Sequence, residues 1–176
     1  MKLMIRQEKL SDEAEVYRVV SLAFGQELEA KLVVALRLSD AFVPALSLVA
    51  LMEEEVVGHI LFSKIRIVNE DKKEEESLAL APLAVHPLFQ RKGIGAKLVE
   101  RGLEIAQKLH FQSVIVLGHE NYYPKFGFVP ASTWEIQAPF PVNPKAFMGK
   151  ELVSGALKHI KGTVKYAKPF EMAVDL

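Results

Sequence analysis

The residues whose types and spacing could do chemistry are concentrated in one loop near the middle of the chain. The segment Gln90-Arg91-Lys92-Gly93-Ile94-Gly95 follows a short apolar run over residues 79–85 and leads straight into an amphipathic stretch over residues 94–110. The first backbone N–H groups of a helix have no partner inside the helix, and the helix dipole places partial positive charge there. Glycines let a bulky anion approach the backbone, and Arg91 and Lys92 add positive charge. The loop is therefore predicted to bind a phosphate or pyrophosphate group.

Two common phosphate-binding loops do not match this segment. A Walker loop requires Gly-Lys-Ser/Thr, which does not follow these glycines. A dinucleotide fingerprint requires a third glycine where Leu98 stands, and the loop comes after a predicted run of antiparallel strands. The alternative interpretation is an ordinary strand-to-helix turn with capping glycines.

The wider string Leu83-Ala84-Val85-His86-Pro87-x-x-Gln90-x-x-Gly93-x-Gly95-x-x-Leu98 resembles the central motif of the GNAT superfamily of N-acetyltransferases. A second string, Asn121-x-Tyr123-x-x-x-Gly127-Phe128, is similar to that family's second recurrent signature, in the correct order and at a family-like separation. Residues 129–176 exceed what the minimal family domain needs. They resemble the extension of a branch of small, uncharacterised bacterial acetyltransferases.

The resemblance implies acetyl-coenzyme A as co-substrate. It also implies that the pyrophosphate lies on the loop and that the pantetheine arm pairs with the preceding strand and an asparagine. The expected cofactor-binding residues are Leu83, Val85, Arg91, Lys92, Gly93, Ile94, Gly95, Ala96 and Asn121. A plain helix cap is the alternative role for Asn121.

Tyr123 is the expected catalytic residue, because by resemblance it points at the coenzyme sulfur. A tyrosine pKa near 10 exceeds that of a thiol at about 8.5, so the hydroxyl is protonated at pH 7 and can donate to the leaving thiolate. The alternative is a structural tyrosine packed on Phe126 and Phe128.

The general base is not identified. Many family members carry a glutamate on the strand before the loop, whereas here that strand reads Leu78-Ala79-Leu80-Ala81-Pro82. The titratable candidates are His59, His86, His119 and Glu120, and each also fits a surface or hydrogen-bonded structural role. A water chain, or an acceptor with a low pKa, would need no dedicated base.

The surrounding pattern predicts the elements that position these residues. Strands are expected at residues 2–6, 46–52, 56–68 and 77–85, and a continuous apolar run predicts a buried parallel strand at 113–117. Gly58 marks a bulge or a close backbone approach. The fold class is therefore α+β, a mixed sheet of GNAT-like type. Antiparallel strands come first, followed by a right-handed parallel βαβ crossover. The resemblance further implies that the two parallel strands splay apart and that helices cover both faces of the sheet.

Two short helices are expected after the first strand. Ser11 is predicted to cap the first, Gly25 to end it, and the second to open near Gln26 with Arg37 facing solvent. In the C-terminal part we expect loop at 139–144, a short helix within 146–157, and strands at 162–166 and 171–176.

Composition narrows the range of possible functions further. The chain has 176 residues, which predicts a single domain over residues 1–176, an acetyltransferase domain by the resemblance above. Its 22 basic residues balance 22 acidic ones. This balance gives no support to a nucleic-acid partner. The absence of cysteine excludes thiolate chemistry, and no histidine spacing suggests a metal site. No signal peptide or membrane span is recognised, so a cytoplasmic location is expected and a homodimer is left open.

The leading hypothesis is an acetyl-CoA-dependent N-acetyltransferase that moves an acetyl group to a small-molecule or peptide amine by direct attack in a ternary complex. The alternatives are a non-catalytic acyl-CoA-binding sensor of the same fold, a transferase using a longer acyl group or an O-acceptor, and an unrelated nucleotide-binding protein. The acceptor is not identified, because a fold does not define its substrate.

Overall fold

The computed structural model describes residues 2–171, which divide into two compact units. Unit 1 is formed by the described residues of Met1–Ser63, Ala81–Ile105 and Ala167–Leu176, and unit 2 by Lys64–Leu80 and Ala106–Tyr166. Two long strands, β3 (Glu55–Val68) and β4 (Glu74–Val85), each contribute residues to both units.

An antiparallel sheet forms the centre of unit 1. Strand β1 (Leu3–Gln7) pairs with β2 (Phe42–Met52), β2 pairs with β3, and β4 follows β3 in the sheet order. Every residue from Leu46 to Leu51 is buried, which explains why all of them except Ser47 are apolar. The expected strands are confirmed, and β2 begins four residues earlier than predicted.

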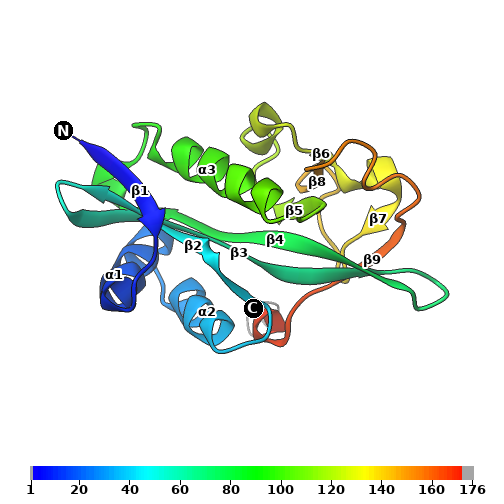
Figure 1. The fold of residues 1–176 in the computed structure, drawn as a ribbon, viewed down its shortest axis with the longest axis horizontal. Helices are drawn as coiled ribbons and strands as arrows, with labels where there is room; N and C mark the ends of the chain where they lie inside the picture. The colour runs from blue at the N-terminus through cyan, green and yellow to red at the C-terminus, as the bar shows by residue number, and fades with distance from the viewer. Residues whose placement is uncertain (1, 172–176) are drawn as a thin grey trace. The chain divides into compact units, whose positions relative to one another are not determined.

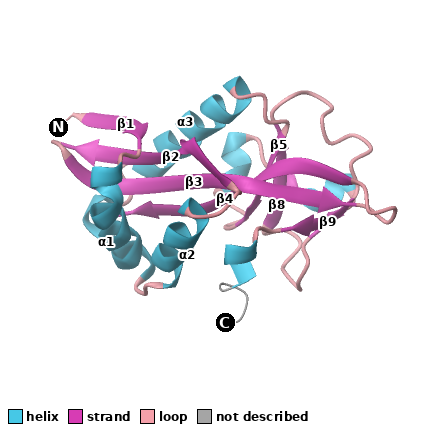
Figure 2. Cartoon of the chain, turned by 60° about the horizontal axis from the view of Figure 1, so that its bottom comes forward, coloured by secondary structure: helices cyan, strands magenta, loops and turns pink. Residues whose placement is uncertain are grey.

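Helices cover both faces of this sheet. Figure 1 shows α1 (Glu13–Phe24) and α2 (Leu28–Arg37) on one face and α3 (Ile94–Lys108) on the other. Helix α3 buries Ile94, Leu98 and Val99 and leaves its charged side chains exposed. Figure 2 shows α1 and α2 side by side, in agreement with their contact.

The start of α1 differs from the prediction. A 3-10 turn, η1 (Leu10–Asp12), precedes the helix, so Asp12 rather than Ser11 is the N-cap residue. The Asp12 carboxylate accepts the Lys9 N–H at 2.7 Å and pairs with Arg6, also at 2.7 Å. These two contacts stabilise the turn, so the Ser11 hydroxyl is not needed as a cap. Gly25 ends α1 with a φ of 67°, as predicted, and α2 begins at Leu28, two residues later than expected.

Gly58 shows both features that its place in a strand suggested. The register between β2 and β3 shifts beside it, from Ala50 opposite Gly58 to Leu51 opposite Val56, which is a bulge. A Cβ at this position would lie 3.1 Å from the Leu98 side chain and 3.2 Å from the Ala84 carbonyl oxygen. The glycine therefore lets α3 and the neighbouring strand approach the backbone closely.

Unit 2 is built around β5 (Ser113–Leu117), which pairs in parallel with β4 at Leu78–Val114 and Ala79–Ile115. On its other side β5 pairs antiparallel with β8 (Phe147–Glu151), and β8 pairs with the two-residue strand β6 (Val129–Pro130). The remaining strands, β7 (Ile136–Gln137) and β9 (Gly162–Lys165), pair with each other, and β9 also pairs with β3. Figure 1 shows this group of strands.

The helix expected within residues 146–157 is wrong. Residues 147–151 form β8, because both of its edges find strand partners, and a turn stabilised by the bond from Leu157 N–H to the Glu151 carboxylate (2.8 Å) follows. The strand predicted at 162–166 is confirmed as β9. The strand predicted at 171–176 falls almost entirely outside the described residues. Among the helices of residues 2–171, none is both long and apolar enough to cross a membrane.

We expect Gly102→Ala to destabilise the protein, because the added Cβ would collide with the fully buried ring of Phe62. Overpacking of a core typically costs about 1–3 kcal/mol, and because the Phe62 ring is fully buried and cannot move aside we expect the upper part of this range. That cost exceeds the gain of about 1 kcal/mol from alanine's helix propensity. Urea unfolding measures the difference. The control is Glu100→Ala on the exposed side of the same helix, expected to stay within about 0.5 kcal/mol of the parent. A Gly102→Ala protein as stable as the parent would contradict this packing.

Candidate functional site

The predicted anion-binding loop joins β4 to α3 within unit 1. A 3-10 turn, η2 (Pro87–Phe89), follows the strand, and the His86 ring nitrogen Nδ1 accepts the Leu88 N–H at 3.1 Å. The backbone then adopts positive φ values of 63° at Arg91 and 82° at Gly93 before the helix begins at Ile94. An arginine in the left-handed region costs on the order of 1 kcal/mol, and such conformations are often found at functional sites.

The start of α3 leaves backbone donors free for a ligand. Its first hydrogen bond runs from the Lys97 N–H to the Gly93 carbonyl at 3.2 Å, so the N–H groups of residues 94–96 have no acceptor inside the helix. Arg91 and Lys92 are exposed beside them, and residues 86–97 contain no aspartate or glutamate. A Cβ built on Gly93 meets no protein atom within 4 Å. This loop can therefore hold a diphosphate by backbone donors and positive charge.

The end of β4 also offers unpaired backbone groups. The His86 N–H bonds the Val57 carbonyl of β3 at 2.8 Å, and strand geometry alternates the two edges, so Leu83 and Val85 direct their N–H and C=O groups away from β3. On that edge β4 pairs with β5 only at Leu78 and Ala79. The Val85 carbonyl accepts the Gln90 side-chain amide at 3.0 Å. Gln90 thus ties the strand end to the loop and leaves strand donors available.

Tyr123 lies in unit 2, at the start of the 3-10 turn η3 (Tyr123–Phe126). Its ring packs edge-on against Phe128, at 5.7 Å between centroids, and against the Cα of Gly118, where any side chain would collide with it. The residue is only 8 % exposed, and this burial raises the pKa of Tyr123 well above its usual value. The phenol is therefore protonated throughout the neutral pH range.

The Tyr123 hydroxyl remains available to a ligand. No hydrogen bond to it is formed by any other described residue. It is also not among the fully buried polar atoms without a partner, which within residues 2–171 are Ser21 Oγ, His59 Nδ1 and Ser63 Oγ. The ring is therefore buried while the oxygen stays accessible. Tyr123 packs on Phe128, and its hydroxyl has no hydrogen-bond partner among the described residues, so the structural interpretation does not exclude the catalytic one.

Asn121 is exposed in the turn before η3. The residue that caps η3 is Tyr122, with no side-chain cap hydrogen bond, so the helix-cap interpretation of Asn121 is wrong. The loop residues and the end of β4 are brought together within unit 1. Asn121 and Tyr123 are neighbours within unit 2.

The four candidate bases lie in different settings. His119 and Glu120 are exposed, and His86 already accepts a backbone hydrogen bond. His59 is completely buried on β3, so it cannot reach a substrate as a base. Within residues 2–171, no group of three histidines, aspartates or glutamates could hold a metal ion.

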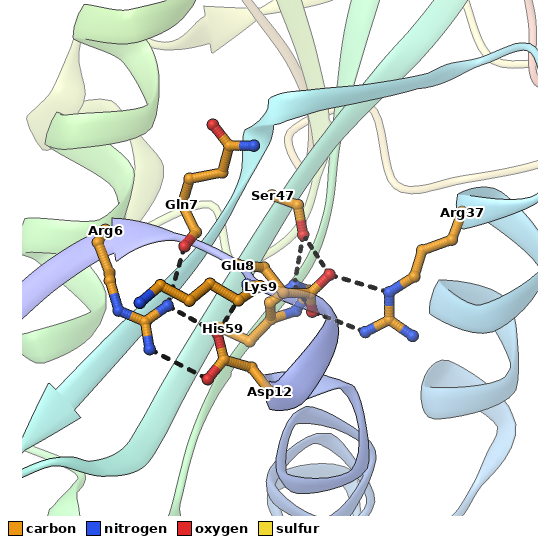
Figure 3. A network of polar contacts seen from close by, with 8 residues as sticks. All are labelled: Arg6, Gln7, Glu8, Lys9, Asp12, Arg37, Ser47 and His59. Atoms are coloured by element: carbon orange, nitrogen blue, oxygen red, sulfur yellow. Dashed lines mark hydrogen bonds and ion pairs between the residues drawn. The ribbon is translucent and has the colours of Figure 1, made fainter.

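His59 belongs to a buried polar network that the sequence analysis missed (Figure 3). Its Nε2 lies 3.1 Å from Ser47 Oγ, which in turn lies 3.3 Å from Glu8 Oε1. Arg37 closes the network with two bonds to the Glu8 carboxylate, at 2.6 and 2.9 Å. The prediction that Arg37 faces solvent is wrong, because its side chain is only 11 % exposed and pairs with the 6 % exposed Glu8.

The network is not a nucleophilic triad. In a triad the carboxylate orients the histidine through the ring nitrogen that is remote from the serine. Here Glu8 approaches Nε2, the same nitrogen that meets Ser47, and Nδ1 has no partner among the described residues. Burial and the charge of Arg37 lower the pKa of His59 to about 3, so the ring is neutral. The sequence signal that could have revealed this network is the presence of Ser47 and His59 within two otherwise apolar strands.

We predict that His59 makes stability depend on pH. Above pH 6.5 the His59 ring is neutral in both the folded and the unfolded protein. Between pH 6.5 and about 3 the ring is protonated only in the unfolded chain. The free energy of unfolding therefore falls as the pH falls through this window. The slope from this residue approaches 1.4 kcal/mol per pH unit, about 3–5 kcal/mol over the whole window.

Urea unfolding at intervals between pH 7 and pH 4.5 measures this slope. The glutamine of the His59→Gln variant cannot be protonated, so we expect the free energy of unfolding of this variant to depend less on pH. His119→Gln, on an exposed histidine, should leave the pH dependence unchanged. Equal slopes for the parent and His59→Gln would show that the buried ring is not the titrating group.

Comparisons with known proteins agree with the geometry. The model of the Acetyltransferase (GNAT) family matches residues 14–128. The uncharacterized N-acetyltransferase YjhQ of Escherichia coli K12 is 37 % identical over 164 residues, 92 % of this chain and 90 % of that protein. The crystal structure of E. coli YhbS with CoA has a TM-score of 0.89 at 28 % identity, covering 97 % of this chain and 93 % of the other. A Brucella melitensis GNAT acetyltransferase with acetyl-CoA has a TM-score of 0.78 at 29 % identity, covering 96 % and 98 %.

Proposed function

The chain belongs to the GNAT family of acetyltransferases, and we propose that it transfers the acetyl group of acetyl-CoA to an amine by direct attack within a ternary complex. The family supports acetyl-CoA as the co-substrate, and the structures of YhbS and the Brucella protein contain CoA and acetyl-CoA. The amine acceptor, the single-step attack, the action of both units as one domain and a cytoplasmic location are parts of the proposal.

One observation carries the proposal: the free N–H groups of residues 94–96 stand beside two exposed cations in a segment without a carboxylate. We assign the pyrophosphate of the co-substrate to Arg91, Lys92, Gly93, Ile94, Gly95 and Ala96. Helix dipole, backbone donors and side-chain charge all favour an anion at this point.

The pantetheine arm is assigned to the free edge of β4. Its amide groups can pair with the backbone of Leu83 and Val85, whose N–H and C=O groups point away from β3. Asn121, exposed in unit 2, is the proposed side-chain partner of the same arm.

Tyr123 is assigned as the general acid. As the amine nitrogen bonds to the acetyl carbon, the carbon–sulfur bond breaks, and the Tyr123 hydroxyl gives its proton to the departing sulfur. The tyrosinate is then reprotonated by the proton that the amine loses. The high pKa of this buried phenol keeps it in the donating form, and its hydroxyl is not engaged by any other described residue.

No side chain is assigned as the general base. The strand before the loop carries no acid at residues 78–82, which is the one observation that favours the non-catalytic sensor. Release of free CoA thiol with a panel of amines separates the two functions, because a sensor binds acetyl-CoA without turnover.

We expect Gly95→Leu to abolish CoA binding without unfolding the protein. Gly95 lies in the first turn of α3, where leucine is a better helix former, but its side chain would cover the N–H groups assigned to the pyrophosphate. The measurement is the shift of the melting temperature with CoA. The control is Glu100→Leu, one turn further along and exposed, which should keep the shift. An unchanged CoA-induced shift in Gly95→Leu would place the diphosphate elsewhere.

We expect Tyr123→Phe to lower kcat by roughly 100-fold or more, the usual contribution of a positioned general acid, with the KM for acetyl-CoA changed by less than about two-fold. Steady-state thiol release measures both constants. Tyr122→Phe removes a neighbouring hydroxyl and serves as the matched control, with kcat near that of the parent. A Tyr123→Phe enzyme with parental kcat would reduce this tyrosine to a structural role.

A further inference from the structure

Gly118, the residue that follows β5, stands against the ring that carries the proposed proton donor. A Cβ built on Gly118 would collide with Cε2 of Tyr123 and would lie 3.1 Å from Cδ2 and 3.4 Å from Cζ of the same ring. The three nearest atoms thus all belong to this one side chain. Because Cζ is the carbon that bears the hydroxyl, Gly118 borders the ring at the edge that leads to its oxygen.

The backbone does not explain the glycine at this position. Gly118 is not among the glycines with a positive φ, so an alanine could adopt the same conformation without strain. The neighbour that excludes a side chain is the ring of Tyr123. The requirement for glycine at the end of β5 therefore comes from the tyrosine.

Two aromatic rings also hold Tyr123 in place. Its ring meets Phe128 at 5.7 Å between centroids and an interplanar angle of 75°, and it meets Tyr122 at 5.1 Å and 88°. Both are the edge-to-face geometry that aromatic pairs prefer. Phe128 is only 1 % exposed, and a packed interior leaves it little room to move aside for a displaced ring. The position of the Tyr123 ring is therefore set by Gly118 together with these two neighbours.

The C-terminal extension fixes Gly118 itself. Strand β5 pairs with β8 up to the preceding residue, and the Gly118 N–H then donates to the Ala146 carbonyl at 2.9 Å. After the tyrosine the chain returns to the same strand, because β6 pairs with the other edge of β8. The segment that carries Tyr123 is thus attached to β8 at both of its ends, and the contact between Gly118 and the ring is anchored in the sheet.

We propose that Gly118 is a positioning residue for the acetyl transfer, because it keeps free the space that the Tyr123 ring needs to direct its hydroxyl at the leaving sulfur. The inference rests on the assignment of Tyr123 as the general acid. A methyl group at this position would push the ring aside by on the order of 1 Å, the shift that restores an ordinary carbon–carbon contact. A misplacement of that size at a reacting group can cost about 100-fold in rate.

The test is a double-mutant cycle on kcat for thiol release. We expect Gly118→Ala to lower kcat by about 10- to 100-fold while CoA still raises the melting temperature as in the parent. In the Tyr123→Phe background the ring and its collision persist but the hydroxyl is absent, so the same alanine should change kcat by less than about two-fold. A purely structural defect would instead lower kcat by the same factor in both backgrounds.

Gly149→Ala is the matched control on the neighbouring strand. A Cβ on Gly149 would lie 3.1 Å from the Trp134 ring and 3.2 Å from the Ile115 side chain, so this alanine is also crowded. Gly149 pairs with Ile115, three residues before Gly118, and strand alternation therefore places the two glycines on opposite faces of the sheet. We expect Gly149→Ala to keep kcat within about two-fold of the parent, because its contacts do not include the tyrosine.

A second measurement does not depend on turnover. An NMR spectrum of protein labelled with a carbon isotope at tyrosine Cζ shows one signal for each of the four tyrosines, and the Tyr123 signal is the one that Tyr123→Phe lacks. Gly118→Ala should move this signal, and Gly149→Ala should leave it in place. If Gly118→Ala does not fold, Phe128→Leu removes another contact of the ring, and we expect the same result: a loss of kcat that disappears in the Tyr123→Phe background.

The inference is overturned if Gly118→Ala, or Phe128→Leu in its place, keeps the parental kcat, loses the same factor with and without the Tyr123 hydroxyl, or leaves the Tyr123 signal where it is in the parent. Failure of the proposed function looks different. In that case CoA raises the melting temperature but no amine releases thiol, or Tyr123→Phe turns over at the parental rate.

Discussion

The site depends on one constraint, which is that a strand must end and a helix must begin within the few residues between Val85 and Ile94. Proline at 87 and positive φ values at Arg91 and Gly93 make the turn, and Gln90 ties it back to the strand. Because a helix cannot satisfy its own first N–H groups, the turn leaves donors exposed beside two cations. The strand end contributes a second free edge, since β4 pairs with β5 at only two positions. Both sets of donors are backbone groups, so their positions are set by the path of the chain through the strand end and the turn.

The core of unit 1 supports this turn. It is apolar on the face of the sheet that α3 covers and partly polar on the face that α2 covers. Gly58 and Gly102 allow the sheet and α3 to approach closely, with Leu98 and Phe62 as their neighbours. On the opposite side, Glu8 and Arg37 are both nearly buried, which is costly unless the pair is well hydrogen-bonded. Their two short bonds meet that condition and join the end of β1 to α2. His59 and Ser47 complete the polar contacts of the pair, so the network has a structural role.

Unit 2 holds the tyrosine against the glycine that follows β5. Gly118 is required where it stands, because a side chain there would displace the Tyr123 ring. Burial of that ring explains the raised pKa of its hydroxyl. The C-terminal extension is an integral part of the sheet, because its strands β8 and β9 pair with β5 and β3.

The sequence by itself determined the features that depend on neighbouring residues. The strand-loop-helix order around Gly93, the bulge at Gly58, the end of α1 at Gly25 and the parallel strand at 113–117 all follow from local pattern. Only the tertiary structure decided the features that join distant segments. Arg37 was expected in solvent because nothing near it in the sequence reveals Glu8. Strand β8 was expected as a helix because its partners lie 18 to 38 residues away. Side-chain pairing and strand insertion are set by which segments meet in space, and a local pattern carries no information on that.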